Sequence, residues 1–147
     1  MGCVSVLIAT RNAASRTQLE RSLEGWGYRV TSASDGKSAQ ELLQATSFDI
    51  CILDWDMPGI SGFELCKQLR SSRSDTSPLV ILSASPAQLE DARSKKEAGA
   101  NDYITEPFDL RYVRHRMAGL AQIVLFRQDL EAAHVGESTL SSGTAFS

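Results

Sequence analysis

The feature that most constrains the fold is a repeated change in the spacing of apolar residues. Short apolar runs at residues 4–9, 50–53 and 79–82 have the length of strands, and amphipathic segments of helix length separate them. Such runs are typical of strands buried on both faces, and alternating strands and helices favour a parallel sheet. Weaker strand patterns at residues 28–33 and 102–104 complete five strand–helix units. The sequence therefore predicts an α/β fold with a parallel sheet.

Helix patterns and end signals agree with this division. Three segments carry apolar residues three or four positions apart; they contain Leu19, Leu23 and Trp26, then Ala39, Leu42 and Leu43, then Phe63, Cys66 and Leu69. Asn12 is a candidate N-cap for the first helix, which Gly25 or Gly27 can end. Ser85 and Gln88 have the spacing of a capping box around Pro86. These elements predict a flavodoxin-like doubly wound sheet flanked by five helices.

The last helix is expected to be longer than the sheet requires. After Asp109 the helical pattern continues to about His134, and its later part carries a second apolar stripe at Ile123, Phe126 and Leu130. This stripe is either the contact of a partner helix or a frayed amphipathic end. We expect a domain at residues 4–121, an extension at 122–134 that serves as a linker or dimerisation helix, and a flexible tail at 135–147.

Composition and charge exclude several classes of protein. With 147 residues and 42% hydrophobic content, the chain can bury the core of one domain. A net charge of -3 gives no basic surface for nucleic acid, and no apolar stretch approaches the ~18 residues of a membrane span. Without a secretion signal, we expect a cytoplasmic protein. The three cysteines lack a CxxC spacing, so we interpret them as reduced and structural.

Polar residues gather where the predicted strands end. In open parallel sheets, chemistry occurs at the carboxyl edge, because the loops that follow the strands meet there. Asp54 closes the apolar run at residues 50–53, so its carboxylate stands at this edge. The other residues expected there are Thr10, Arg11, Asn12, Asp56, Ser83 and Glu106.

Three motifs in order resemble a known family. They are DICILDWDMPGISG at residues 49–62, LSA at 82–84 and GANDYITEPF at 99–108. Together they resemble the receiver domain of bacterial two-component response regulators, which has the CheY-like fold with strand order 2-1-3-4-5. The resemblance covers about residues 4–121.

The resemblance implies a phosphorylation switch. It places Asp54 as the residue that accepts a phosphoryl group from the phosphohistidine of a sensor histidine kinase, with Mg2+ holding the oxygens. By the same resemblance, Ser83 is the switch hydroxyl and Tyr103 the switch aromatic. The backbone carbonyl of Asp56 would be a metal ligand.

Three positions depart from the family pattern. Thr10 and Arg11 stand where the family has an acidic pair that binds Mg2+, and Glu106 replaces its lysine. A guanidinium has no acceptor for a metal, and at ~5 Å from a dication its repulsion is about 6 kcal/mol at an effective dielectric of ~20. We therefore expect no cofactor, and Mg2+ binding only if the site is active.

Two side chains near Asp54 have alternative interpretations. Arg11 either occupies the place of the metal and bridges Asp54 and Glu106, or it is solvated. Trp55 either stands on the rim of the pocket, where it reports binding, or partly covers the fourth helix.

Two functional hypotheses follow. The first is an atypical receiver, or pseudo-receiver, that acts by protein–protein interaction. The alternative is a receiver that a sensor histidine kinase phosphorylates on Asp54. We do not expect an enzyme. Expected partners are a sensor kinase or other signalling proteins, and a second copy bound through residues 86–121 and the extended last helix. Nucleic acid and membrane are not expected partners of this segment.

Overall fold

The computed structural model describes residues 3–71, 77–94 and 99–144, with side chains described except at 92–94 and 134–144. Its five strands form one parallel sheet in the order β2-β1-β3-β4-β5, as predicted. The strands are β1 (Ser5–Ala9), β2 (Arg29–Ala33), β3 (Ile50–Asp54), β4 (Leu79–Ser83) and β5 (Asp102–Ile104).

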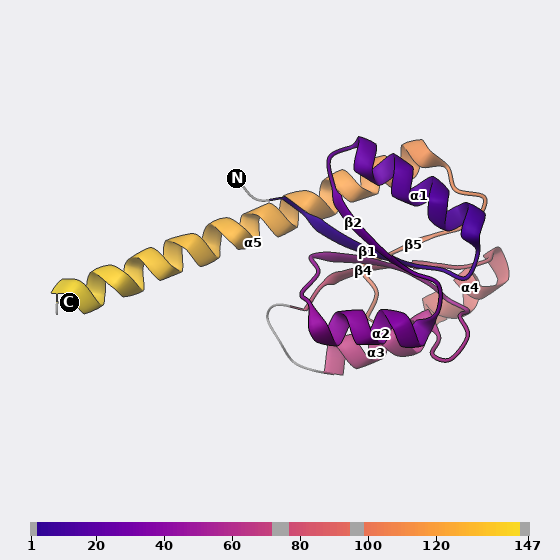
Figure 1. Ribbon diagram of the computed structural model, residues 1–147, viewed down its shortest axis with the longest axis horizontal. Helices are drawn as coiled ribbons and strands as arrows, with labels where there is room; N and C mark the ends of the chain where they lie inside the picture. Colours follow the sequence, from indigo (N-terminus) through magenta and orange to yellow (C-terminus); the bar gives the residue numbers. More distant parts are fainter. Residues whose placement is uncertain (1–2, 72–76, 95–98, 145–147) are drawn as a thin grey trace.

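Helices cover both faces of the sheet (Figure 1). They are α1 (Ala13–Gly25), α2 (Gly36–Ala45), α3 (Gly62–Ser71), α4 (Pro86–Ser94) and α5 (Leu110–Thr144). Successive strand residues point to opposite faces, so Ile52 packs with the α1 and α5 side while Leu53 packs with the α2 and α3 side. The predicted doubly wound fold is confirmed.

Local hydrogen bonds confirm the predicted helix starts. The Asn12 side chain accepts from the backbone N–H of Ser15 at 2.9 Å, and α1 ends at Gly25. At α4, Ser85 Oγ accepts from the N–H of Gln88 at 3.2 Å, and Gln88 Oε1 accepts from the N–H of Ser85 at 3.0 Å. Both donors would otherwise lack a partner at the helix end.

The last helix is longer than predicted. α5 runs from Leu110 to Thr144, so the expectation of a flexible tail is wrong for residues 135–144, and residues 145–147 lie outside the described part. Small polar residues suggested a tail, but there is no proline to stop the helix, and Gly costs only about 1 kcal/mol relative to Ala. In Figure 1 the helix projects well beyond the sheet.

The cysteines divide between core and surface. Cys51 and Cys66 are buried, as expected of structural cysteines, whereas Cys3 is exposed and plays no part in the core. Burial raises the pKa of the Cys66 thiol to about 11, so it stays protonated at neutral pH. None of the helices within the described ranges combines the length and apolar content needed to cross a membrane.

Candidate functional site

The site is centred on Asp54, which ends β3 at the carboxyl edge of the sheet and is half-buried. Parallel pairing places Asp54 beside Ser83 of β4. The N–H of Trp55 donates to the carbonyl oxygen of Ser83 at 2.7 Å, which ties the end of β3 to the end of β4. The predicted gathering of Asp54, Ser83 and the residues after β1 is therefore present.

Thr10 is the direct neighbour of the Asp54 carboxylate. Its hydroxyl donates to Asp54 Oδ2 at 3.0 Å and accepts from the N–H of Asn12 at 3.2 Å. The Thr10 side chain is buried, and its carbonyl oxygen accepts from Arg16 Nη1 at 2.7 Å. A hydroxyl has one hydrogen, and here Asp54 receives it. Thr10 thus gives Asp54 a fixed neutral donor.

Arg11 does not bridge Asp54 and Glu106. The side chain is exposed, and within the described part of the chain it forms no ion pair with either carboxylate. The bridging interpretation is therefore wrong. The position beside Asp54 belongs to the Thr10 hydroxyl, and an exposed guanidinium keeps its hydration and rotamer freedom.

Glu106 is held by a residue that the sequence did not point to. The hydroxyl of Ser15 on α1 donates to the Glu106 carboxylate across 91 positions of chain. Ser15 follows the N-cap Asn12 by three residues, so the start of α1 points it at the loop after β5. The sequence offered one signal for the contact between Ser15 and Glu106, namely that the loops after β1 and β5 should meet at the carboxyl edge of the sheet.

The pKa of Asp54 is raised above its ordinary value. Burial is the largest cause, because it disfavours the charged form, and the nearby Glu106 carboxylate adds to the rise. The hydrogen bonds from Thr10 and from the N–H of Asp56 lower the pKa, as does the positive charge of Arg11. These opposing contributions leave a carboxyl group that gains a proton more readily than an exposed aspartate.

The two predicted switch positions lie on neighbouring strands. Ser83 ends β4 and is buried with 5% of its surface exposed. Tyr103 pairs with Leu82 in the sheet and is half-buried against the apolar cluster on the α2 and α3 side. Both positions therefore line the sheet near its carboxyl edge.

A side-chain contact links the site loop to α4. Asp56 is exposed, and its carboxylate accepts a hydrogen bond from Nε2 of Gln88. Gln88 is positioned by the capping box with Ser85. The sequence revealed the capping box but not this second use of the Gln88 side chain.

Trp55 packs on α3. Its ring lies 4.8 Å from the ring of Phe63, centroid to centroid, and the residue is half-buried. At Gly62 a Cβ would lie 2.2 Å from the Asp54 carbonyl oxygen, so the start of α3 approaches the site too closely for a side chain. The loop from β3 to α3 is thereby held against the sheet.

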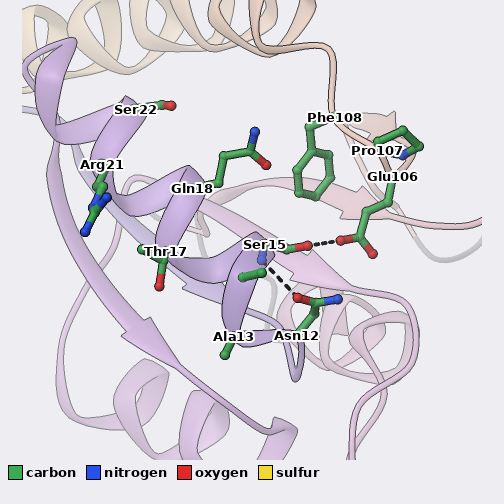
Figure 2. A pocket seen from close by; sticks show the side chains of 11 residues that line it. Asn12, Ala13, Ser15, Thr17, Gln18, Arg21, Ser22, Glu106, Pro107 and Phe108 are labelled. Carbon is green, nitrogen blue, oxygen red and sulfur yellow. Dashed lines mark hydrogen bonds between the residues drawn. The ribbon is translucent and has the colours of Figure 1, made fainter.

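A groove of about 1160 Å³ adjoins the site between α1 and the loop after β5. Figure 2 shows Asn12 and Ser15 on one side and Glu106, Pro107 and Phe108 on the other. The hydrogen bond between Ser15 and Glu106 connects these two sides. Asp54 does not line this groove.

The donor set at the sheet edge is poor in metal ligands. No group of three or more His, Cys, Asp or Glu side chains that could hold a metal occurs among the described residues. Beside Asp54 stand a hydroxyl that donates to it and an exposed arginine. Mg2+ prefers several oxygen ligands, usually with more than one carboxylate.

Comparison with known proteins identifies the fold and the family. Residues 6–118 match the response regulator receiver domain family. The chain is 38% identical over 117 residues to the response regulator MprA of Mycolicibacterium vanbaalenii, which covers 80% of this chain and 50% of that protein. It is 36% identical over 113 residues to the transcriptional regulatory protein AfsQ1 of Streptomyces coelicolor, covering 77% and 49%.

Solved structures agree. The receiver domain of the Francisella response regulator 1452 superposes with a TM-score of 0.73 at 28% identity, covering 81% of this chain and 97% of that one. The chemotaxis response regulator CheY4 of Vibrio cholerae has the same fold, with a TM-score of 0.74 at 24% identity and coverage of 81% and 99%. The chain spans about half the length of the curated relatives it matches. It belongs to the family of response regulator receiver domains.

Proposed function

We propose that this receiver domain is atypical and regulates by binding other proteins, without phosphoryl transfer to Asp54. The observation that carries the proposal is the hydrogen bond from Thr10 to Asp54, at a position where the family resemblance implies a metal-binding carboxylate. Phosphoryl transfer depends on positive charge and donors around the moving oxygens. Here the nearby Glu106 carboxylate opposes that charge.

The residues present do not suit Mg2+. Asp54 and the Asp56 carbonyl remain from the implied ligand set, but the acidic pair is replaced by Thr10 and Arg11. The Thr10 hydroxyl uses its hydrogen on Asp54. A metal bound to Asp54 would have to displace this donor and would meet the charge of Arg11. No step of the proposed function therefore requires a metal.

The proposed route of output is the surface formed by α4, β5 and α5. Gln88 supports this route, because its hydrogen bond to Asp56 connects the loop after Asp54 to the start of α4. Arg116 of α5 pairs with Asp102 of β5, which fixes the other side of this surface. A change at the site loop can thus reach a surface available for a partner.

The alternative is a receiver phosphorylated on Asp54 by a sensor histidine kinase. It is favoured by the retention of Asp54 at the end of β3, with Ser83 beside it and Tyr103 on the next strand. In this case Mg2+ binding would have to accompany phosphorylation, since the metal neutralises the transferred group.

Treatment with acetyl phosphate and Mg2+ separates the two functions. We expect no added phosphoryl group in the intact mass of the chain. The combined variant Thr10→Asp, Arg11→Asp, Glu106→Lys restores the implied charges and should gain one phosphoryl group, which Asp54→Asn then abolishes. A phosphoryl group on the unaltered chain that is lost in Asp54→Asn would refute the proposal.

A further inference from the structure

Large exposed apolar side chains concentrate on one helix. Among residues with described side chains, the exposed ones are Tyr112, Ile123, Leu125, Phe126 and Leu130, all on α5. Phe126 and Leu130 have 63% and 53% of their surface exposed. At 3.6 residues per turn, four of the five lie along one side of α5, and Leu125 lies on another side.

This exposed side differs from the side that packs on the domain. Val113, Met117, Leu120 and Val124 are buried in the core cluster between α5 and the sheet. The outer side carries apolar or small residues at alternating spacings of four and three, namely Gly119, Ile123, Phe126, Leu130 and Ala133. We call these five residues the α5 seam. Their mean spacing of 3.5 residues is that of a coiled coil.

The α5 seam is exposed along its length, and its last residues lie beyond the contacts of α5 with the domain. Arg127 Nη1 donates to the carbonyl oxygen of Ser77 at 3.3 Å, which anchors the middle of the helix near the start of β4. Beyond this point the helix projects away from the sheet (Figure 1). The fourteen residue steps from Gly119 to Ala133 advance about 21 Å along the axis, which is two heptads.

We propose that the α5 seam pairs with the same seam on a second copy of this chain, as a parallel two-stranded coiled coil. A stripe of two apolar positions per heptad is narrow and matches one helix of the same period, while a broad apolar groove would suit a globular partner. A second copy of this chain carries the same spacing of apolar residues, so its α5 seam can pair with the first in register. Phe126 then faces Phe126, and Gly119 lets the two backbones approach.

The charges beside the α5 seam favour the parallel arrangement. In a parallel pair Gln122 of one copy lies opposite Arg127 of the other, so the flanking contact has no repulsion. An antiparallel pair centred on Phe126 brings the two Arg127 side chains toward each other. Like charges at this separation oppose pairing.

The size of the α5 seam sets the strength of the pairing. One aromatic ring buries about 150–250 Å², and each copy offers Phe126 and two aliphatic side chains. The total stays below the ~1,200–2,000 Å² of a stable interface, so the pair is weak and reversible. It deepens the proposed role of α5 in protein contacts but does not involve Asp54, so the two proposals can fail separately.

Sedimentation velocity over a range of concentrations tests the pairing. The full chain should shift from the mass of one copy toward that of two as concentration rises. Phe126→Glu should remain a single copy throughout. The matched control Leu125→Glu, which adds the same charge to a neighbouring exposed apolar position of α5, should behave as the unaltered chain, and so should Asp54→Asn.

Two results would overturn the proposal: a single-copy mass for the unaltered chain at every concentration, or equal weakening by Phe126→Glu and Leu125→Glu. Far-UV circular dichroism shows whether Phe126→Glu keeps its helix, and Leu130→Ala provides a second variant that favours helix and should weaken pairing. In a Cys3→Ser background, Ala133→Cys should form a disulfide between copies on mild oxidation with diamide. Leu125→Cys should not, and the reverse pattern would exclude the parallel α5 seam.

Discussion

At the scale of single residues, the site is defined by the donor that reaches Asp54. Thr10 contributes a hydroxyl where the family resemblance implies a carboxylate, and its hydrogen bond to Asp54 is 3.0 Å long. The carboxylate is thereby held by a neutral group while burial and Glu106 raise its pKa. Removing the Thr10 hydroxyl should therefore change the pKa of Asp54.

Thr10→Val should raise the pKa of Asp54 further, because it removes a hydrogen bond that stabilises the ionised form. It should also cost about 0.5–1.5 kcal/mol of unfolding free energy, since the hydrogen bond from Thr10 to Asp54 is lost. The pKa is measured by NMR titration of the Asp54 carboxyl carbon. Thr17→Val, at an exposed position of α1, is the control, and an unchanged or lowered pKa in Thr10→Val would contradict this account.

The raised pKa of Asp54 determines whether the free energy of unfolding rises or falls with pH. A carboxyl group whose pKa is raised by folding holds its proton more tightly in the folded state, so its contribution to stability falls as pH rises. The loss begins near the ordinary carboxyl pKa and is complete above the raised pKa of Asp54. In Thr10→Val this window should extend to higher pH.

The sequence predicted which residues lie at the carboxyl edge of the sheet, but it did not predict which of their side chains contact one another. Asp54, Thr10, Ser83 and Glu106 could be placed at one edge, because strand ends are readable from apolar runs. The predicted partner of Glu106 was wrong because opposite charges suggested Arg11, whereas a hydroxyl on α1 forms the contact. Side-chain pairing between distant loops depends on loop conformation, which local patterns do not specify.

At the scale of elements, α4 is attached to the site loop by one side chain with two functions. Gln88 Oε1 completes the capping box, and its Nε2 donates to Asp56. An amide can do both because it carries an acceptor and a donor. A carboxylate at this position can keep the first contact but not the second.

Gln88→Glu should therefore keep the start of α4 but release it from Asp56, because two carboxylates repel. We expect faster hydrogen exchange in α4 and a loss of about 0.5–1.5 kcal/mol in unfolding free energy. Gln44→Glu, which makes the same change at an exposed position of α2, should leave exchange in α4 unaltered. Equal exchange in α4 for both variants would show that this contact does not hold the helix.

Element ends were predictable where a local hydrogen bond sets them. The cap residues Asn12 and Ser85 begin their helices as expected. The end of α5 was not predictable in the same way, because the residues after His134 have neither a stop signal nor a strong preference. Composition alone then suggested a tail where the structure continues the helix to Thr144.

At the scale of the whole molecule, a receiver domain of the response regulator family is joined to a projecting helix. Residues 6–118 belong to the receiver domain family of response regulators, whose members are signalling modules. The family binds Mg2+ when active and interacts with histidine kinases. The proposed departure from that behaviour rests on the few residues around Asp54.

Titration with Mg2+, followed by the fluorescence of Trp55, tests most directly the proposal that Asp54 does not bind Mg2+. Trp55 adjoins Asp54 and packs on Phe63, and a Trp26→Phe background removes the second indole. The combined variant Thr10→Asp, Arg11→Asp serves as the control that should respond to submillimolar Mg2+. We expect no saturable change for the otherwise unaltered chain over that range. A saturable change at submillimolar Mg2+ that Asp54→Asn abolishes would contradict it.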